Sequence, residues 1–416
     1  MSNPPLPRSN KQRAATHLRA SDARAVVQLA TQATRGVARM AEGVHQSVWS
    51  TMGAPAGKSS DQTRGITGFV YQSIHGITQM IGTAADRALS RLESFLPAID
   101  YESPQSHQRE AVLAALNGVL GDHLLANNNP FATQMSLRMQ GRVLDKHNFP
   151  NKSEVTGKVL VLIHGLCMND LQWASQHSDA LHDALGYTPV YLRYNTGLHT
   201  SRNGAELSQQ LEMLAQLWPV KITEICVLAH SMGGLVTRSA IAHAQAMAQD
   251  QHLTWLSRLK RVVFLGTPHH GAPLERAGNW VDVILGATPY SAPFKKLGQL
   301  RSAGITDLRY GFVLESDWQG RDRFRRQPDH RTPVPLPETV TCFTIAASTA
   351  SKRSPISERL IGDGLVPLQS ALGQHSDPQY DLKFAKSCVF VAYNMNHLAL
   401  LNSPVVTRKL LQWLGA

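Results

Sequence analysis

The chain has 416 residues, of which 43% are hydrophobic and 17% are charged. This composition excludes a disordered or low-complexity protein and leaves room for one large catalytic domain with an appendage. Its formal net charge of +11 favours anionic partners or surfaces without choosing among them. No zinc-finger, helix-turn-helix or RNA-binding signature accompanies the charge, so we expect no nucleic-acid partner.

Residues 1–104 predict an amphipathic helical region. Apolar side chains recur every three or four positions over 23–49 and again over 66–95, on either side of a Gly/Ser/Lys-rich break. The basic start of the chain favours contact with a membrane or lipid surface, whereas packing on the catalytic domain or on a partner subunit would explain the same stripes. We find no secretion signal and no apolar run of spanning length, and therefore expect a cytoplasmic protein, either soluble or peripherally membrane-bound.

Residues 105–416 predict an α/β catalytic domain. A helix is expected at 107–120 and an alternating strand at 136–144. Short apolar runs typical of buried strands then begin at residues 158, 189, 224, 260, 340 and 388, and helical patterns lie at 204–217, 234–247 and 398–414. This alternation predicts a doubly wound, mostly parallel sheet. The four cysteines lack metal or redox spacing, so we expect buried free thiols.

Ser231 is the candidate nucleophile. The strand predicted at 224–228 runs into AHSMGG and then into a helix, which would place Ser231 on a sharp strand-to-helix turn at the carboxyl edge of the sheet. Small residues are needed on both sides of such a turn, here Ala229 before the serine and Gly233 and Gly234 after it. An ordinary helix N-cap would explain the serine but not these small neighbours.

Asp363 and His397 are the candidate acid and base that a serine nucleophile requires. Asp363 lies between two glycines after the strand predicted at 339–347, and His397 lies between the last strand and the last helix. The order Ser, Asp, His along the chain is the one found where the nucleophile lies on such a strand-to-helix turn of a parallel α/β sheet. The competing bases and acids do not occupy such strand-end positions; they are His269, His270, His375, Asp377 and Asp381.

Acyl transfer to a serine nucleophile also needs hydrogen-bond donors for the oxyanion of the tetrahedral intermediate. The backbone N–H of Met232, just after the nucleophile, is the first candidate. The second is the N–H of Leu166 in HGLCMND, after the strand that starts at residue 158, with the neighbouring Cys167 a weaker candidate.

Five motifs occur in the order found in the lipase and esterase branch of the α/β-hydrolases. They are HG (164–165), AHSMGGLV (229–236), GTPHHG (266–271), GDGLVP (362–367) and NH (396–397). Over 155–416 the chain resembles bacterial lipases and the lipase-like proteins related to the GPI-inositol deacylase. The resemblance implies the α/β-hydrolase fold and the same triad. Ala229 departs from the usual glycine, and no calcium ligand set maps onto the chain, so we expect no metal and no cofactor.

The segment 272–338 falls where this family places its lid, and its apolar side chains could cover the site and open toward an acyl chain, or form a fixed wall. These side chains are Leu274, Ala277, Trp280, Val281, Ile284 and Leu285. The basic run RDRFRRQPDHR at 321–331 is expected to be solvated.

The sequence therefore predicts a serine carboxyl-ester hydrolase, an esterase or lipase, for hydrophobic esters. Two alternatives stay open. The same acyl-enzyme would serve an acyltransferase or thioesterase, and the chain could instead be a lipid-surface or scaffold protein with a vestigial hydrolase domain.

Overall fold

The computed structural model describes residues 107–247, 253–272, 302–322, 329–351 and 362–416. The helical region predicted at 1–104 lies outside the described residues. Glu110–His123 and Thr133–Ala416 belong to one compact unit, which covers most of the range predicted for the catalytic domain, 105–416. Leu124–Ala132 belong to another unit, where helix α5 (His107–Ala126) ends in a turn with Asn128 at a φ of 50°.

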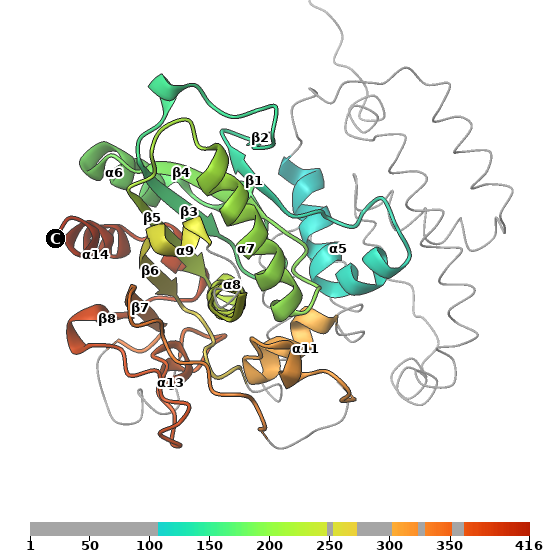
Figure 1. Cartoon of the computed structure of the whole chain (residues 1–416). Helices are drawn as coiled ribbons and strands as arrows, with labels where there is room; N and C mark the ends of the chain where they lie inside the picture. The colour runs from blue at the N-terminus through green and yellow to red at the C-terminus, as the bar shows by residue number, and fades with distance from the viewer. Residues whose placement is uncertain (1–106, 248–252, 273–301, 323–328, 352–361) are drawn as a thin grey trace, which may run out of the picture. The chain divides into compact units, whose positions relative to one another are not determined.

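Within the described residues, eight strands form a single sheet in the order β2-β1-β4-β3-β5-β6-β7-β8 (Figure 1). The strands are β1 (Ser136–Met139), β2 (Arg142–Val143), β3 (Lys158–Ile163), β4 (Thr188–Arg193), β5 (Glu224–His230), β6 (Leu259–Leu265), β7 (Thr341–Ser348) and β8 (Val389–Tyr393). Strands β3 to β8 run parallel, and β1 pairs antiparallel with β2 and β4. The predicted mostly parallel sheet is confirmed.

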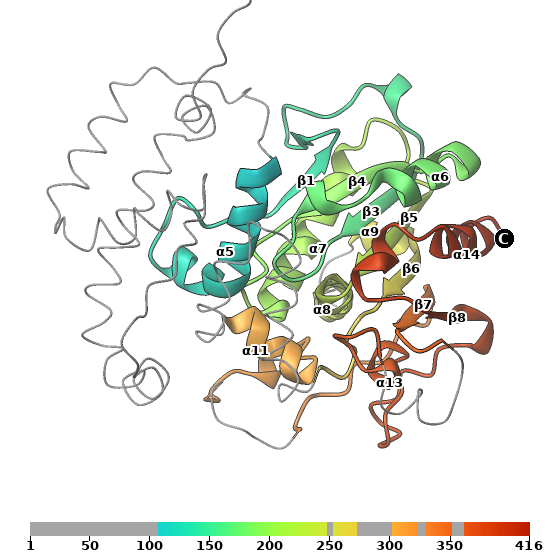
Figure 2. The ribbon, with the colours of Figure 1, turned by 180° about the vertical axis from the view of Figure 1, so that it is seen from behind.

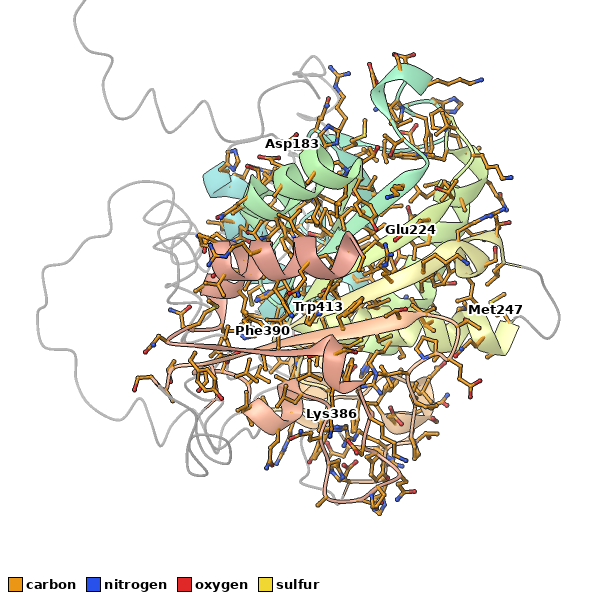
Figure 3. The ribbon with its side chains drawn as sticks, turned by 90° about the vertical axis from the view of Figure 1, so that its left-hand side faces the viewer. Asp183, Glu224, Met247, Lys386, Phe390 and Trp413 are labelled. Atoms are coloured by element: carbon orange, nitrogen blue, oxygen red, sulfur yellow. The ribbon has the colours of Figure 1, made fainter. Side chains whose placement is uncertain are left out.

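Helices cover both faces of the sheet (Figures 1 and 2). On one face α6 (Ser175–Leu185) and α14 (Pro404–Leu414) lie side by side, as Figure 3 shows near its labels Asp183 and Trp413. On the other face α7 (Thr200–Leu217) packs along α8 (Met232–Met247) and the short α9 (Thr254–Arg258). Such a two-sided parallel sheet with this strand order is the α/β-hydrolase fold.

Burial on both faces explains why the central strands are continuous apolar runs. Leu162, Leu228 and Leu265 belong to one buried cluster with side chains of α6 and α14, and each of the three is fully shielded from solvent. Because these strands are parallel, the loops that leave their carboxyl ends meet at one edge of the sheet. All the predicted catalytic residues lie on those loops. The four cysteines are buried, as expected.

Two predicted elements differ from the structure. The strand expected at 136–144 is a hairpin, because Gln140 (φ 49°) and Gly141 (φ 78°) form a tight turn between β1 and β2. The helix expected at 398–414 is interrupted. A 3-10 turn, η6 (Leu398–Leu401), comes first, and α14 begins at Pro404, since proline fits the first turn of a helix but not its interior.

Candidate active site

Ser231 lies alone between the end of β5 and the start of α8. Its φ is 54°, a left-handed conformation that a serine keeps only where its surroundings enforce it. The Ser231 N–H donates to the Leu265 carbonyl at 2.8 Å, and its carbonyl accepts from the Gly234 N–H at 3.0 Å. Its hydroxyl is buried and has no hydrogen-bond partner among the described residues. This geometry is that of a nucleophile elbow.

Steric crowding explains the small residues around the elbow. A Cβ added to Gly233 would lie 2.6 Å from the Ile163 carbonyl oxygen, and one added to Gly234 would lie 2.0 Å from the Thr267 hydroxyl. Ala229 is fully buried within β5 and is not among the described residues with positive φ. Alanine is therefore tolerated two positions before the serine, whereas the two glycines after it are required.

His397 and Asp363 form a buried pair. The His397 Nδ1 lies 2.6 Å from Asp363 Oδ2, and because a carboxylate only accepts, the imidazole proton is on Nδ1. The other carboxylate oxygen accepts from the N–H groups of Leu365 (2.9 Å) and Val366 (2.8 Å). The His397 Nε2 is buried and has no hydrogen-bond partner among the described residues. A base held in this tautomer has its lone pair on Nε2, available to a hydroxyl proton.

The end of β6 brings the serine and the histidine to one place. Leu265 binds the Ser231 N–H, and a Cβ on the next residue, Gly266, would lie 3.1 Å from the His397 ring. His230, the residue before the serine, has its ring centroid 4.6 Å from that of His397 and donates from Nε2 to the His397 carbonyl at 3.2 Å. All three predicted triad residues thus lie at the carboxyl edge of the sheet, around the end of β6, although the Ser231 hydroxyl and His397 Nε2 are not hydrogen-bonded to each other.

The two predicted oxyanion donors flank the serine. A Cβ on Gly165 would come within 3.0 Å of the Ser231 Cβ, so the turn that contains Leu166 touches the nucleophile. The Leu166 N–H has no partner among the described residues, whereas the Cys167 N–H is donated to the Thr196 hydroxyl at 3.1 Å. Met232 is the first residue of α8, where an N–H has no acceptor within the helix. Among the described residues the Leu166 N–H is therefore an unpaired donor and the Cys167 N–H is not, and the Met232 N–H has no acceptor within α8.

Buried polar groups fix the turn that contains Leu166. The Tyr194 hydroxyl donates to the His164 carbonyl at 2.8 Å, and its ring stacks on the His164 imidazole at 4.4 Å. Burial lowers the pKa of His164 to about 4, so this imidazole is neutral near pH 7 and presents no charge to the site.

An ion-pair cluster follows the same turn. Asp170 pairs with Arg193 of β4 and with Arg138 of β1, and Arg193 pairs in turn with Glu110 of α5 at 2.6 Å. All four side chains are buried. The cluster joins α5, β1 and β4 to the end of the turn, and therefore holds the backbone that carries the Leu166 N–H.

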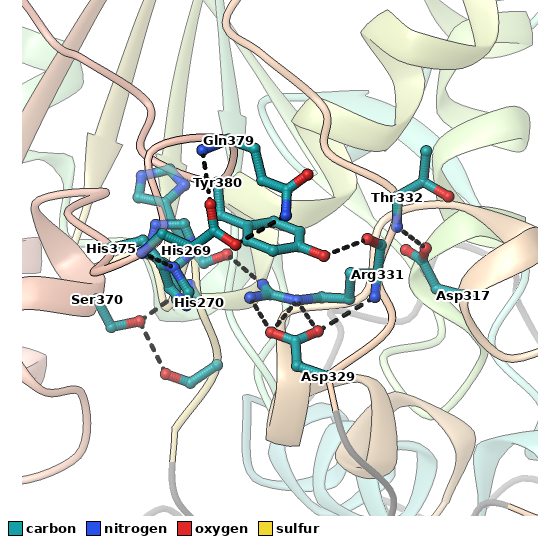
Figure 4. A network of polar contacts seen from close by, with 12 residues as sticks. His269, His270, Asp317, Asp329, Arg331, Thr332, Ser370, His375, Gln379 and Tyr380 are labelled. Carbon is teal, nitrogen blue, oxygen red and sulfur yellow. Dashed lines mark hydrogen bonds and ion pairs between the residues drawn. The ribbon is translucent and has the colours of Figure 1, made fainter.

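The competing histidines belong to a separate polar network, shown in Figure 4. Arg331 donates to the His269 carbonyl at 3.2 Å and forms a two-pronged pair with Asp329. The rings of His270 and His375 lie 5.0 Å apart. This network fixes the conformation of the loop after β6 and does not orient a nucleophile. The expectation that the basic run at 321–331 is solvated is wrong for Arg331, which is buried by these bonds.

The described part of the 272–338 segment is fixed to the domain. Ser302 donates to the Gly118 carbonyl at 2.6 Å, the Ala303 N–H donates to the Asp122 carboxylate at 3.0 Å, and Arg238 of α8 donates to the Val334 carbonyl at 2.7 Å. These bonds attach the described residues of the segment to the domain. The apolar side chains proposed for a lid, residues 274–285, lie outside the described residues.

Sequence reasoning did not assign roles to Asp170, Arg193, Thr196 or His230. An arginine at the end of an otherwise buried strand and an aspartate after HGLCMN were available signals for the ion pair. Nothing in the sequence indicates that Thr196 binds the Cys167 N–H, because that contact joins two loops.

Two kinds of feature are absent from the described residues. No group of three or more His, Cys, Asp or Glu side chains within them is arranged to hold a metal ion. No helix within the same ranges has the length and hydropathy needed to cross a bilayer.

Comparison with known proteins gives one family match and several similar structures. Residues 137–307 match the family model of a domain of unknown function, DUF7379, a range that includes Ser231 and ends before Asp363 and His397. No curated protein matches the chain in sequence.

The structure is similar to a lipase from Bacillus licheniformis in its mature form, with 20% identity and a TM-score of 0.41, covering 64% of this chain and 95% of that one. It is also similar to lipase B from Aspergillus fumigatus, with 11% identity and a TM-score of 0.39 over 68% of this chain and 56% of that one. An esterase from Pyrococcus furiosus has 13% identity and a TM-score of 0.37 over 63% and 81% of the two chains. The fold assignment rests on the strand order and register of this chain.

Proposed function

We propose that this chain is a serine carboxyl-ester hydrolase. One observation carries the proposal. A serine in left-handed conformation between strand and helix has a buried hydroxyl with no partner among the described residues, and the same edge of the sheet holds a buried imidazole whose Nδ1 binds a carboxylate and whose Nε2 has no such partner. This arrangement has the chemical parts of nucleophilic acyl transfer.

In the proposed reaction the Ser231 hydroxyl oxygen attacks the ester carbonyl carbon while His397 Nε2 takes the hydroxyl proton. The oxyanion is bound by the N–H groups of Leu166 and Met232. Collapse of this intermediate releases the alcohol, which leaves with the proton from His397. A water molecule then attacks the acyl-enzyme while His397 takes its proton, and collapse of this second intermediate releases the acid as the Ser231 oxygen regains the proton from His397.

The substrate class is part of the proposal. Hydrophobic esters, including lipid-like ones, are consistent with the sequence resemblance to bacterial lipases and to the GPI-inositol deacylase relatives. The acyl-enzyme could also pass its acyl group to an alcohol or thiol other than water. A vestigial domain would have no need to keep the Ser231, His397 and Asp363 arrangement, which argues against a purely structural role.

The test is hydrolysis of p-nitrophenyl esters from acetyl to palmitoyl by wild type and by a Ser231→Ala variant. We expect turnover by wild type that the substitution abolishes, and the preferred acyl length would separate an esterase from a lipase. Product analysis with an added acceptor alcohol or thiol would detect acyl transfer. Folded wild type that turns over no ester, or a Ser231→Ala variant that keeps full activity, would refute the proposal.

A further inference from the structure

A second histidine–aspartate pair lies next to the candidate active site. His199 precedes α7, and its Nδ1 donates to both oxygens of Asp307, at 2.9 and 3.1 Å. Asp307 belongs to α11 (Ala303–Tyr310), and it also accepts the Thr200 N–H at 2.7 Å. The carboxylate is only 1% exposed. Burial raises the pKa of Asp307, and the bonds from His199 and Thr200 oppose that rise.

The face of the His199 ring is also packed against an aromatic side chain. It stacks on the Trp318 indole with ring centroids 3.6 Å apart and planes within 3° of parallel. The Trp318 Nε1–H in turn donates to the Ser201 hydroxyl at 2.9 Å. Asp307 and Trp318 thus bind the start of α7 at three consecutive residues. We call His199, Asp307 and Trp318 the 199–307 clamp.

The clamp holds α11 against the backbone that carries the oxyanion donors. At the start of α11 the Gly304 N–H donates to the Gly197 carbonyl at 3.1 Å. A Cβ on Gly304 would lie 2.0 Å from the Thr196 carbonyl oxygen and 3.1 Å from the Met232 side chain. Helix α11 therefore packs directly on Met232, the residue with one candidate donor.

Helix α11 is also linked to the turn that carries the second donor, the Leu166 N–H, through Thr196. The Thr196 hydroxyl accepts the Cys167 N–H at 3.1 Å, which fixes the peptide next to Leu166. Thr196 itself packs under Gly304 of α11. One helix thus braces the loop that binds the Leu166 turn and the side chain of Met232.

The chemistry of the clamp favours a role in geometry over a role in stability. Burying a carboxylate carries a desolvation penalty, and well-packed apolar groups would be at least as stabilising at such a place. A directed bond from His199 fixes the distance and orientation between α7 and α11, which apolar packing would leave less defined. Catalysis by backbone donors depends on such positioning, because small displacements reduce the rate.

We propose that His199 and Asp307 are positioning residues for the oxyanion hole formed by the N–H groups of Leu166 and Met232. The proposal rests on the hydrolase function proposed above. It predicts that loss of the clamp weakens binding of the transition state and leaves binding of the substrate nearly unchanged.

Four variants test it. His199→Phe keeps a flat ring against Trp318 and removes the donor, whereas His199→Asn keeps an N–H near the position of Nδ1. Asp307→Asn removes the carboxylate. His182→Phe is the matched control, because His182 is also hydrogen-bonded, to the Tyr187 carbonyl at 2.8 Å, but lies at the end of α6 near the opposite edge of the sheet.

The readouts are kcat, KM and inhibition by a trifluoromethyl ketone, whose adduct with the serine carries an oxyanion. We expect His199→Phe and Asp307→Asn to lower kcat and to weaken inhibition by about tenfold, with KM changed less than about twofold. His199→Asn should stay within about threefold of wild type because it keeps the donor. Endpoint labelling with a fluorophosphonate, together with thermal unfolding, corrects each rate for the folded fraction.

Three outcomes would overturn the clamp while leaving the hydrolase function intact. These are unchanged kcat and inhibition in His199→Phe, a raised KM at constant kcat, which would indicate direct contact with substrate, and an equal loss in His182→Phe. Failure of the hydrolase function would look different, since wild type would then turn over no ester or Ser231→Ala would keep its activity. That result would remove the basis of both proposals.

Discussion

Acidification should destabilise this protein through His164, the buried histidine of the turn that carries the Leu166 donor. Its Nδ1–H donates to the Gly165 carbonyl at 3.0 Å, and its Nε2 is buried with no partner among the described residues. Protonation would place a second N–H where no acceptor is available. Burial therefore lowers the pKa of His164 from 6.5 to about 4.

The sign and the size follow from proton uptake. Because the folded pKa lies below the unfolded one, the unfolded chain binds more protons between these two values, and stability falls as the pH drops through 6.5 toward 4. At about pH 5 an ordinary imidazole is about 97% protonated, whereas one with a pKa of about 4 is about 10% protonated. Integrated from neutral pH, this difference in proton uptake lowers the free energy of unfolding by about 2 kcal/mol.

The assay is urea unfolding of wild type and His164→Asn at about pH 7 and about pH 5. Asparagine keeps a donor for the Gly165 carbonyl and does not titrate. Other buried histidines, including His230, contribute to the pH dependence of both proteins, so the quantity of interest is the difference between them. Wild type should lose about 2 kcal/mol more than the variant over this interval. His147→Asn, at an exposed position, controls for the loss of a histidine. An equal loss in wild type and His164→Asn would refute the reasoning.

Three further predictions concern the candidate site and its support. Gly233→Ala places a Cβ 2.6 Å from the Ile163 carbonyl oxygen and should lower the free energy of unfolding by about 1–3 kcal/mol; an unchanged midpoint of thermal unfolding would contradict this crowding. Asp170→Asn removes a carboxylate partner from the buried Arg193 and Arg138 and should cost about 3 kcal/mol in urea unfolding; an unchanged urea midpoint would argue against a stabilising role of this ion pair. Asp363→Asn should lower kcat by roughly 10⁴-fold at little changed KM, because an amide no longer holds the Nδ1–H tautomer of His397; kinetics of ester hydrolysis within tenfold of wild type would exclude this role.

The fold could be predicted because its signals are local. Strands such as Val159–Ile163 are continuous apolar runs, and burial on both faces of a parallel sheet requires that pattern. The hairpin at Gln140 was missed because glutamine rarely adopts a positive φ, so the turn is legible only from Gly141 beside it. The proline itself is a local signal that a helix begins at Pro404. The apolar periodicity continues on both sides of it, which favours one unbroken helix instead.

The residues of the candidate site could be predicted from the sequence where they lie in loops that follow a strand. Ser231, Asp363 and His397 follow β5, β7 and β8, so chain order alone predicts that they meet at one edge. The supporting contacts follow no such rule. Thr196 binds Cys167 from another loop, and Arg193 binds Glu110 from a helix 83 positions away. Pairings across loops and helices depend on packing in three dimensions, which no periodicity in the sequence encodes.

The two histidine–aspartate pairs illustrate why local chemistry alone does not identify a catalytic base. In both pairs the carboxylate is buried, accepts from backbone N–H groups and binds the imidazole at Nδ1. They differ in what lies on the other side of the ring. The His397 ring lies 4.6 Å from that of His230, the residue before Ser231, and the Ser231 hydroxyl has no partner among the described residues. Near His199 the neighbouring hydroxyl of Ser201 already accepts the Trp318 N–H, and the ring itself is stacked on that indole. An unpartnered serine hydroxyl near the ring therefore distinguishes the pair proposed as catalytic from the clamp.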